Sequence, residues 1–387
     1  MPRNSNNPTL IKFGIVCIAL VNSGNMPLVP ALGAIREAMP DTSPILIQSL
    51  LSVQCLFIGF APIWYAKLVE VIPKLVIMRI GMLTFILAGI APYFFHENIY
   101  IILFFRALVG IGNGIGIIVA MDFVVDFFDG KTRDTMQGAL SASANISGII
   151  YQVVSGFAIQ NDWRNSFLVY TLGFLWFIIA NIFVPEPNRV GKIEKLEGSK
   201  TARAKLNPKV IIFSALTIVL FIVWMTGTTN MAIVLTEEHM GTTGQIGLTT
   251  SLMSVGGFIS AFLFGRIQQR LHHYSILLAY VLSTFGFFAM YLAHNLIFFA
   301  IGAALVGATL GIGIPSKITK VTEMVPYSAA PKAISTITFS VGVGQFLQPL
   351  IYGMLGDIGY GRSGFLISGC AMVLLSLVLV IVLRKVK

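Results

Sequence analysis

The feature of this 387-residue chain that most restricts its fold is a series of twelve apolar stretches, each long enough to cross a lipid bilayer. A hydrocarbon core about 30 Å thick needs roughly 20 consecutive apolar residues in a helix. Because lipid offers no hydrogen-bond partners to the backbone, we expect every such stretch to be helical. The stretches cover approximately residues 12–34, 45–66, 75–94, 98–121, 137–159, 165–185, 209–232, 245–265, 274–293, 297–316, 333–355 and 364–383.

The composition agrees with a membrane protein. Hydrophobic residues make up 56% of the chain and charged residues only 11%, against about 25% charged residues in an average soluble domain. This balance excludes a soluble enzyme, a disordered protein and a nucleic-acid binder. No small-residue cleavage site is evident near the first stretch, which we expect to remain as a span. The sequence therefore predicts an all-α membrane protein with twelve transmembrane helices.

The basic residues predict how the chain is oriented. The net charge is +10, but the lysines and arginines lie mainly in short gaps between apolar stretches. An even number of spans puts both termini on one side, and 22 of the 26 lysines and arginines fall in segments on that side. By the positive-inside rule, both termini are expected in the cytoplasm of a protein in the cell membrane.

The sequence offers no sign of a metal, a cofactor or a catalytic site. The three cysteines, Cys17, Cys55 and Cys370, all fall in apolar stretches and are read as small buried side chains. Metal-ligand spacings and nucleotide-binding loops are not found, and no cluster of histidine, acidic and nucleophilic residues converges as a membrane enzyme would require. We therefore expect a protein that is not an enzyme and that is a monomer. Its expected partners are the lipid bilayer, a small organic solute and, if transport is coupled to them, protons.

The chain contains an internal repeat. At an offset near 197 residues, Ala107–Gly110 and Gly114–Ile117 match Ala304–Gly307 and Gly311–Ile314. One polar gap, rich in Lys, Glu and Ser, separates the sixth and seventh stretches. We therefore expect two pseudo-symmetric six-helix bundles, residues 1–185 and 209–387, joined by a cytoplasmic linker at 186–208. Repeated bundles of this kind are typical of secondary transporters, with the solute site between them.

The fourth stretch resembles a known family. Its segment Arg106-Ala-Leu-Val-Gly110-Ile-Gly112-Asn-Gly114 is similar to the Arg-x-x-x-Gly-x-Gly signature of the major facilitator superfamily, and the resemblance covers the whole chain. It implies a twelve-helix transporter fold in which Arg106 influences proton or anion traffic. Physically, an arginine in a span needs a cavity, a carbonyl or a counter-ion, or it must extend to the membrane surface.

Two other family motifs are altered here. The loop after the second stretch, Ala66-x-x-x-Glu70-x-x-Pro73-Lys74, has the spacing of the family's Gly-x-x-x-Asp-x-x-Gly-Arg loop but none of its residues. The resemblance implies that Glu70 and Lys74, with Arg270 in the corresponding loop of the second half, form a gate. In the fifth stretch, Tyr151-Gln152 stands where drug antiporters of the family carry Gly-Pro, which weakens an antiporter assignment.

Polar side chains inside the apolar stretches are the candidates for solute binding. They fall mainly in the stretches that, in the family, line the central cavity. The set is Asn22, Asn25, Gln54, Arg106, Asn113, Asn145, Tyr151, Gln152, Trp224, Asn230, Gln345 and Gln348. For each Asn or Gln, an interhelical hydrogen bond worth about 1 kcal/mol is an equal alternative.

Proton coupling has few candidates in this sequence. Proton transport needs a group on the path that titrates, and no Asp or Glu lies in the middle of a stretch. Asp122, near the cytoplasmic end of the fourth stretch, is the candidate, and a site on the solute itself or an uncoupled mechanism are the alternatives. A buried arginine among amides and hydroxyls favours a neutral or anionic organic solute, and the 29 Phe and 15 Met would admit an amphiphilic one.

The sequence thus predicts a proton-coupled secondary transporter that works by alternating access. The fourth-stretch motif favours efflux. Uptake of an organic anion or metabolite, and a lipid flippase of the same fold, remain as alternatives.

Overall fold

The computed structural model describes residues 7–187, 208–325 and 330–385, and within these ranges the chain is almost entirely helical and has no strand. Ten helices of the described part are long and apolar enough to cross a membrane. The longer helices are α3 (Pro44–Val71), α4 (Lys74–Ile90), α5 (Ile99–Phe127), α6 (Gly130–Ala158), α10 (Pro208–Glu237), α11 (Thr243–Leu271), α12 (Ser275–Leu292), α13 (Leu296–Glu323), α14 (Ala330–Met354) and α15 (Gly361–Lys385). The short helix α7 (Asn165–Leu168), a 3₁₀ turn and α8 (Leu172–Phe183) together form one more span.

The two other expected spans are present in a different form. The first is divided into α1 (Pro8–Ala19), two short 3₁₀ turns at Leu20–Ser23 and Met26–Leu28, and α2 (Leu32–Ala38). The fifth is α6, which is as long as α5, at 29 residues, but contains many serines and other polar residues. Twelve membrane passes are therefore accounted for, and the prediction of an all-α membrane protein is confirmed.

Corresponding helices of the repeat begin in the same way. Asn98 caps α5 by accepting a hydrogen bond from the Tyr100 backbone, and Asn295 caps α13 by accepting one from Phe298. Ser43 and Thr242 cap α3 and α11 in the same manner. Each cap satisfies a backbone N–H that the first helical turn leaves unpaired. The same capping chemistry, about 197–199 residues apart, fixes where the matching helices of each half start.

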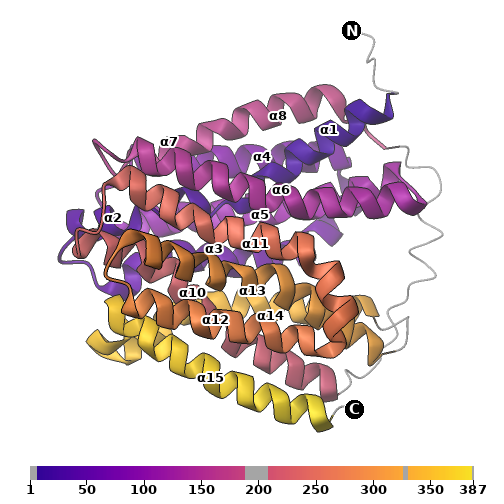
Figure 1. Cartoon of the computed structure of the whole chain (residues 1–387). Helices are drawn as coiled ribbons and strands as arrows, with labels where there is room; N and C mark the ends of the chain where they lie inside the picture. Colours follow the sequence, from indigo (N-terminus) through magenta and orange to yellow (C-terminus); the bar gives the residue numbers. More distant parts are fainter. Residues whose placement is uncertain (1–6, 188–207, 326–329, 386–387) are drawn as a thin grey trace.

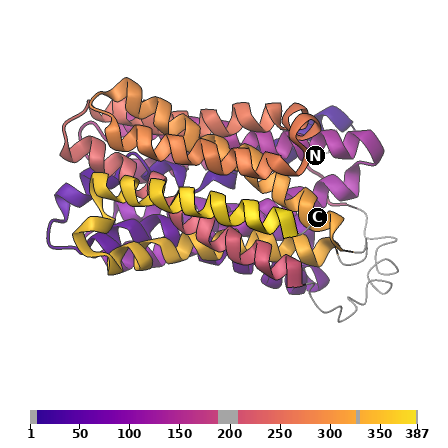
Figure 2. The ribbon, with the colours of Figure 1, turned by 60° about the horizontal axis from the view of Figure 1, so that its bottom comes forward.

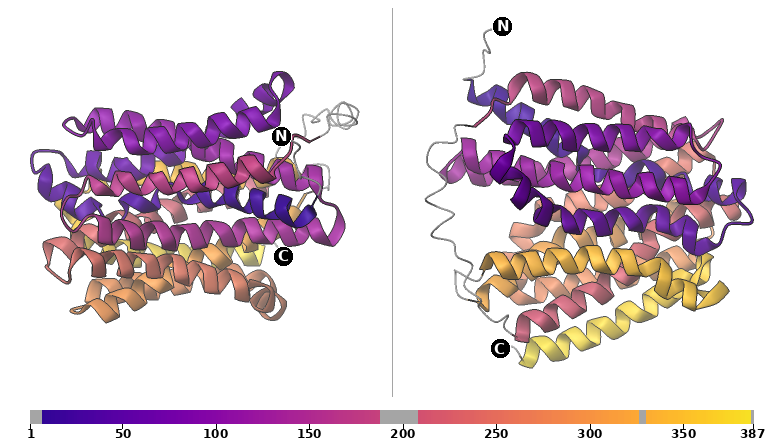
Figure 3. Two further views of the ribbon diagram at one scale, coloured as in Figure 1. Left: turned by 90° about the horizontal axis from the view of Figure 1, so that it is seen from above. Right: turned by 180° about the vertical axis from the view of Figure 1, so that it is seen from behind.

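The helices run side by side, and the start of α1 and the end of α15 lie at the same end of the bundle (Figure 1). We call this the terminal end and the opposite one the distal end. Helices α1–α8 form the first half and α10–α15 the second half, and Figure 3 shows the two stacked on each other. Helix α15 runs along the outside of the second half (Figure 2). The expected linker at 186–208 lies outside the described residues except at its ends.

Two helix pairs carry most of the contact between the halves, α6 with α11 and α3 with α14. At the distal end the α6–α11 contact is so close that a Cβ at Gly156 would lie 2.5 Å from the Gly247 Cα. Towards the terminal end the same helices separate, since a Cβ at Gly138 on α6 or Gly265 on α11 would have no atom within 4 Å. The halves therefore pack against each other at the distal end and diverge at the terminal end.

One sequence-based placement is wrong. The 22 lysines and arginines assigned to the cytoplasmic segments include Lys317 and Lys320, which directly follow the tenth stretch at 297–316, but α13 continues to Glu323. Lys317 is only 1% exposed. The apolar stretch ended at residue 316 because the charged residues lowered the local hydropathy, although the helix itself does not stop there.

Candidate functional site

The break in the first span exposes backbone carbonyls in the membrane interior. Pro27 and Pro30 lack an N–H, so the helical hydrogen-bond ladder cannot continue through them. The carbonyls that are freed here are bonded by side chains from other helices. The Gly24 carbonyl accepts hydrogen bonds from Arg106 and Tyr170, and the Pro27 carbonyl accepts one from Ser155. Side chains from other helices thus supply the hydrogen bonds that the backbone carbonyls lose at the break, as a backbone in the membrane interior requires.

Arg106 is the centre of this arrangement and is completely buried. Its Nε donates to the Leu50 carbonyl at 2.7 Å, and its Nη2 donates to the Asn25 side chain at 2.8 Å. Its Nη1 donates to Gly24 O and to the Tyr170 hydroxyl. Of the roles considered for Arg106, the structure places it against carbonyls within the first half, so the alternative of an arginine extending to the membrane surface is wrong.

Gly24 fits this site because it has no side chain. A Cβ there would lie 2.7 Å from the Gln54 amide nitrogen and 2.9 Å from that of Asn113. The amide of Asn25 donates in turn to the Cys55 sulfur at 3.1 Å. The structure therefore brings four sequence-predicted residues, Asn25, Gln54, Arg106 and Asn113, together around one broken helix.

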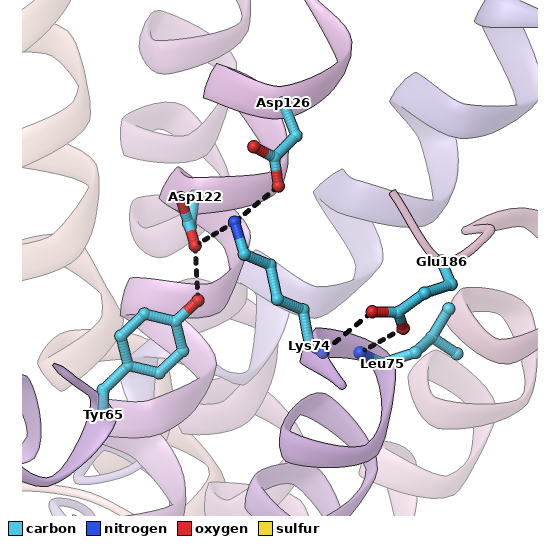
Figure 4. Close-up of polar contacts among 6 residues, drawn as sticks. All are labelled: Tyr65, Lys74, Leu75, Asp122, Asp126 and Glu186. Atoms are coloured by element: carbon cyan, nitrogen blue, oxygen red, sulfur yellow. Dashed lines mark hydrogen bonds and ion pairs between the residues drawn. The ribbon is translucent and has the colours of Figure 1, made fainter. Parts of the chain in front are cut away.

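A second polar cluster joins α3, α4 and α5 near the terminal end (Figure 4). The Lys74 ammonium lies 2.5 Å from Asp122 Oδ2 and 2.6 Å from Asp126 Oδ2. The Tyr65 hydroxyl donates to the same Asp122 oxygen at 2.5 Å. In this conformation Lys74 is bound to acids of its own half, while Glu70 and Arg270, which were expected to form a gate with it, are exposed.

The start of α4 is fixed in the same region. Both carboxylate oxygens of Glu186 accept backbone hydrogen bonds, from Lys74 N at 3.0 Å and from Leu75 N at 2.9 Å (Figure 4). A carboxylate at a helix N-terminus satisfies free N–H groups and interacts favourably with the helix dipole. Glu186 therefore anchors the end of the first half to the helix that carries Lys74.

A third cluster crosses between the halves near the distal end. The Gln48 amide on α3 donates to the Asn230 side chain on α10 at 2.5 Å, and Gln348 on α14 donates to Gln48 at 3.1 Å. All three side chains are completely buried. Uncharged amides in such a relay can be separated at lower cost than buried charges, so this cluster has the chemistry of a gate that opens.

The α6–α11 contact carries another polar bridge. Ser254 on α11 donates to the Gln152 side chain at 3.1 Å, and the same amide donates to the Met26 sulfur at 3.2 Å. Asn145 lies beside Gly257, because its Oδ1 would be 3.2 Å from a Cβ there. Gln152 therefore links the broken first span to the second half.

The remaining predicted residues do not join one cluster. Trp224 is buried and donates to the Val306 carbonyl at 3.0 Å, which is a packing role inside the second half. Tyr151 is buried, and Gln345 is partly buried on α14. Asn22 lies in the first 3₁₀ turn.

Sequence reasoning missed Tyr170 and Lys317. Tyr170 sits in an aromatic part of the sixth span, where nothing in its sequence context separates it from a lipid-facing tyrosine. Among the described residues, Arg106 and Lys317 are the fully buried charged side chains, and both are cations.

The chain matches a family of known proteins along its length. The model described as the Major Facilitator Superfamily matches residues 12–234 and 212–387. The cis,cis-muconate transport protein of Acinetobacter baylyi is 24% identical over 287 residues, which is 69% of this chain and 68% of that protein. The multidrug transporter protein MdtP of Bacillus subtilis is 29% identical over 119 residues, 30% of this chain and 21% of that protein.

Solved structures share the fold. A bacterial homolog of the human lysosomal transporter Spinster, in an inward-facing and unoccupied conformation, has a TM-score of 0.75 at 16% identity and covers 97% of this chain and 95% of that one. The nucleoside transporter NupG has a TM-score of 0.77 at 10% identity and covers 97% and 99%. With the family match, the repeat and the helix arrangement, this multi-pass membrane protein belongs to the Major Facilitator Superfamily of transporters.

Proposed function

We propose that this protein is a secondary active transporter that moves a small organic solute between its two halves by rocker-switch alternating access. The observation that carries the proposal is the one-sided contact between the halves. The pairs α6–α11 and α3–α14 pack tightly at the distal end, while Gly138 and Gly265 face open space at the terminal end. A path closed at one end and open at the other is one of the two states that alternating access requires.

The contacts at the distal end are suited to opening. They include the Gln48–Asn230–Gln348 amide relay and glycine-to-glycine packing, and each ion pair of the described residues lies within one half. Amide hydrogen bonds of this kind contribute about 1 kcal/mol each in a membrane protein. A solute with a modest preference for one state could therefore shift the balance between the two.

The buried charges favour an anionic or neutral solute over a cation. Arg106 and Lys317 place positive charge in the interior, and the described helices bury no carboxylate to the same degree. The cis,cis-muconate transport protein is named for a dicarboxylate, which agrees with this reading. We extend the proposal to organic anions, including amphiphilic ones.

For direction, the proposal is proton-coupled export, with uptake of an organic anion as the alternative. The Arg106–Gly114 motif and the relatives named as an efflux pump and a multidrug transporter support export. Asp122 is the proposed proton site, since it shares Lys74 with Asp126 and accepts from Tyr65. Replacing Lys74 would remove a positive charge beside the Asp122 carboxylate, and replacing Tyr65 would remove a hydrogen-bond donor to it.

The test is transport by purified protein in liposomes. Transport of carboxylates such as cis,cis-muconate, benzoate and succinate is measured under an imposed pH gradient. Each carboxylate is compared with its uncharged methyl ester. We expect accumulation of at least one carboxylate and loss of that activity in Arg106→Ala, with Tyr100→Phe, an exposed position at the start of α5, as a control.

The direction of the gradient separates the two alternatives. Accumulation driven by an acid lumen in inside-out vesicles supports export, and uptake into right-side-out vesicles supports import. Transport of cations alone, unaffected by Arg106→Ala, would overturn the proposed substrate class.

A further inference from the structure

Lys317 on α13 is a buried lysine with no anionic partner among the described residues. Its side chain is 1% exposed, and its Nζ has no hydrogen-bond partner among the described residues. The ammonium instead lies 5.2 Å from the ring centre of Tyr280 on α12 and 6.0 Å from that of Phe221 on α10. A protonated lysine has three N–H donors, and here none of them has an acceptor.

The direction of α13 explains why Lys317 does not reach water. Side chains on a helix tilt towards its N-terminus, and α13 starts at the distal end and finishes at the terminal end. Lys317 therefore points back into the second half, away from the nearer surface. Lys320, one turn later, is partly exposed and lies 3.8 Å from Glu323.

The two helices whose rings lie near Lys317, α10 and α12, also hold buried hydroxyl groups without partners among the described residues. Among the described residues, the side-chain oxygens of Ser214, Tyr280 and Ser283 are buried without a hydrogen bond. Tyr280 is the residue whose ring covers the Lys317 ammonium, and Ser214 lies two turns before Phe221 on the same face of α10. Aromatic rings offset only part of the cost of burying a charge, and donors without acceptors add to that cost.

We propose that Lys317 and the hydroxyl of Tyr280 form a binding site for the carboxylate group of the transported solute. The proposal rests on the proposed function, because it assigns the solute's negative charge to a place in the second half. A carboxylate supplies acceptors for the ammonium and for the phenol hydroxyl at once, and charge-assisted hydrogen bonds of this kind are the strong ones. Arg106 is less suited to this role, since it already donates to two carbonyls and two side chains.

Phe221 is the wall that closes this site in the present conformation. Its ring lies over Lys317, and its Cβ would be 2.8 Å from a Cβ at Gly344 on α14. Phe221 thus stands between Lys317 and α14, one of the two second-half helices that contact the first half. Opening the site towards the path therefore requires α14 to move against α10 within the second half, in addition to the rocking of the two halves.

The experiment measures binding of the carboxylate panel to the detergent-solubilised full chain by thermal shift and by equilibrium binding. Lys317→Met keeps the length of the side chain and removes its charge, and Lys320→Met is the matched control three residues along α13. We expect Lys317→Met to bind the preferred carboxylate at least about tenfold more weakly, in line with loss of a hydrogen bond to a charged group. Lys320→Met should bind it like the wild type. Without ligand, Lys317→Met should melt at the same temperature as the wild type or higher, because it removes an unpaired buried charge.

A second variant, Tyr280→Phe, tests the site independently if Lys317→Met does not fold. Tyr280→Phe removes one hydroxyl from the site and should weaken carboxylate binding several-fold without changing binding of the methyl ester. Unchanged carboxylate binding by Lys317→Met or by Tyr280→Phe overturns the site.

The remaining outcomes separate the site from the proposed function. A wild-type protein that binds esters or other neutral solutes but no carboxylate overturns the carboxylate site and leaves the proposed transport of a neutral solute standing. Stabilisation by chloride alone, lost in Lys317→Met, assigns the site to an inorganic ion and overturns its assignment to the solute.

Discussion

Arg106 shows how a charged side chain can be kept in the membrane interior without a counter-ion. Four partners accept its hydrogen bonds: the Gly24 carbonyl and the Asn25 side chain at the break in the first span, the Leu50 carbonyl on α3 and the Tyr170 hydroxyl. The geometry depends on a planar guanidinium, whose donors form a fixed fork. The positive charge and the break in the helix therefore support each other.

Arg106→Lys tests whether shape or charge matters at this position. Lysine keeps the charge but cannot reach both the Leu50 carbonyl and Asn25 with a fixed fork. We expect a loss of roughly 3–5 kcal/mol in the free energy of unfolding, as for a broken buried charge network, measured by thermal or denaturant unfolding in detergent. Wild-type stability in Arg106→Lys would mean that the hydrogen-bond geometry is not important.

Tyr170→Phe tests the other donor to the break. The variant loses the hydroxyl that donates to the Gly24 carbonyl at 2.5 Å and accepts from Arg106. We expect a destabilisation of about 1–3 kcal/mol, the cost of leaving a buried polar group unsatisfied. The matched control is Tyr100→Phe, where the ring is 65% exposed, and a similar loss there would contradict the assignment.

At this scale the sequence predicted part of the site. The family motif pointed to Arg106, and the polar residues of the apolar stretches pointed to Asn25, Gln54 and Asn113 around it. Neither could identify Tyr170, which is separated from Gly24 by 146 residues. The charge count places Lys317 outside the membrane because it assumes that every lysine next to an apolar stretch lies in water. Its burial depends on the direction and length of α13, which the count does not contain.

Among the helices, α6 and α11 form the pair on which the proposed rocking of the two halves depends most. Their glycines allow backbone contact at the distal end, and they diverge towards the terminal end. Spans of normal hydropathy were predicted well from the sequence, since helix length in lipid is set by bilayer thickness. The polar fifth span was predicted with a later start, at residue 137 and not at Gly130, because its first turns are hydrophilic.

Gly156→Val tests the distal contact between these helices. A side chain at Gly156 would overlap the Gly247 backbone, so the distal end could not close and the terminal-end-open state would lose stability. Overpacking of this kind costs roughly 1–3 kcal/mol. We expect strongly reduced solute transport by protein that is still folded, as judged by gel filtration and circular dichroism.

The control for this variant is Leu248→Val, next to Gly247 on α11 but with a side chain that is 47% exposed. It should leave transport near the wild-type rate. Equal loss of transport in both variants would contradict the role given to the distal contact.

Considered as a whole, the molecule is two similar bundles, and their helices α6 and α11 are closest at the distal end. The repeat predicted this division, because matching segments 197 residues apart must make matching folds. It could not predict the conformation, since the same sequence must support at least two. The direction of opening follows from cross-half contacts such as Gln48–Asn230, which join positions 182 residues apart in the chain.

Orientation in the membrane is predicted from the charges alone and can be measured directly. Single cysteines at Gly138 and Gly265, in a background without Cys17, Cys55 and Cys370, face open space at the terminal end. A membrane-impermeant maleimide should label them rapidly from the cytoplasmic side and not from outside the cell. Labelling from the outside would reverse the predicted topology.

The most direct test of the account is the distance between these same two positions during transport. Nitroxide labels on Gly138→Cys and Gly265→Cys, in the purified protein in lipid nanodiscs, report the separation of α6 and α11 at the terminal end by pulsed electron resonance. Rocking of the two halves predicts a long distance in the state described here and a second, shorter distance when the transported solute is added. A single distance that does not respond to a solute that the same preparation transports would contradict alternating access by rocking of the two halves.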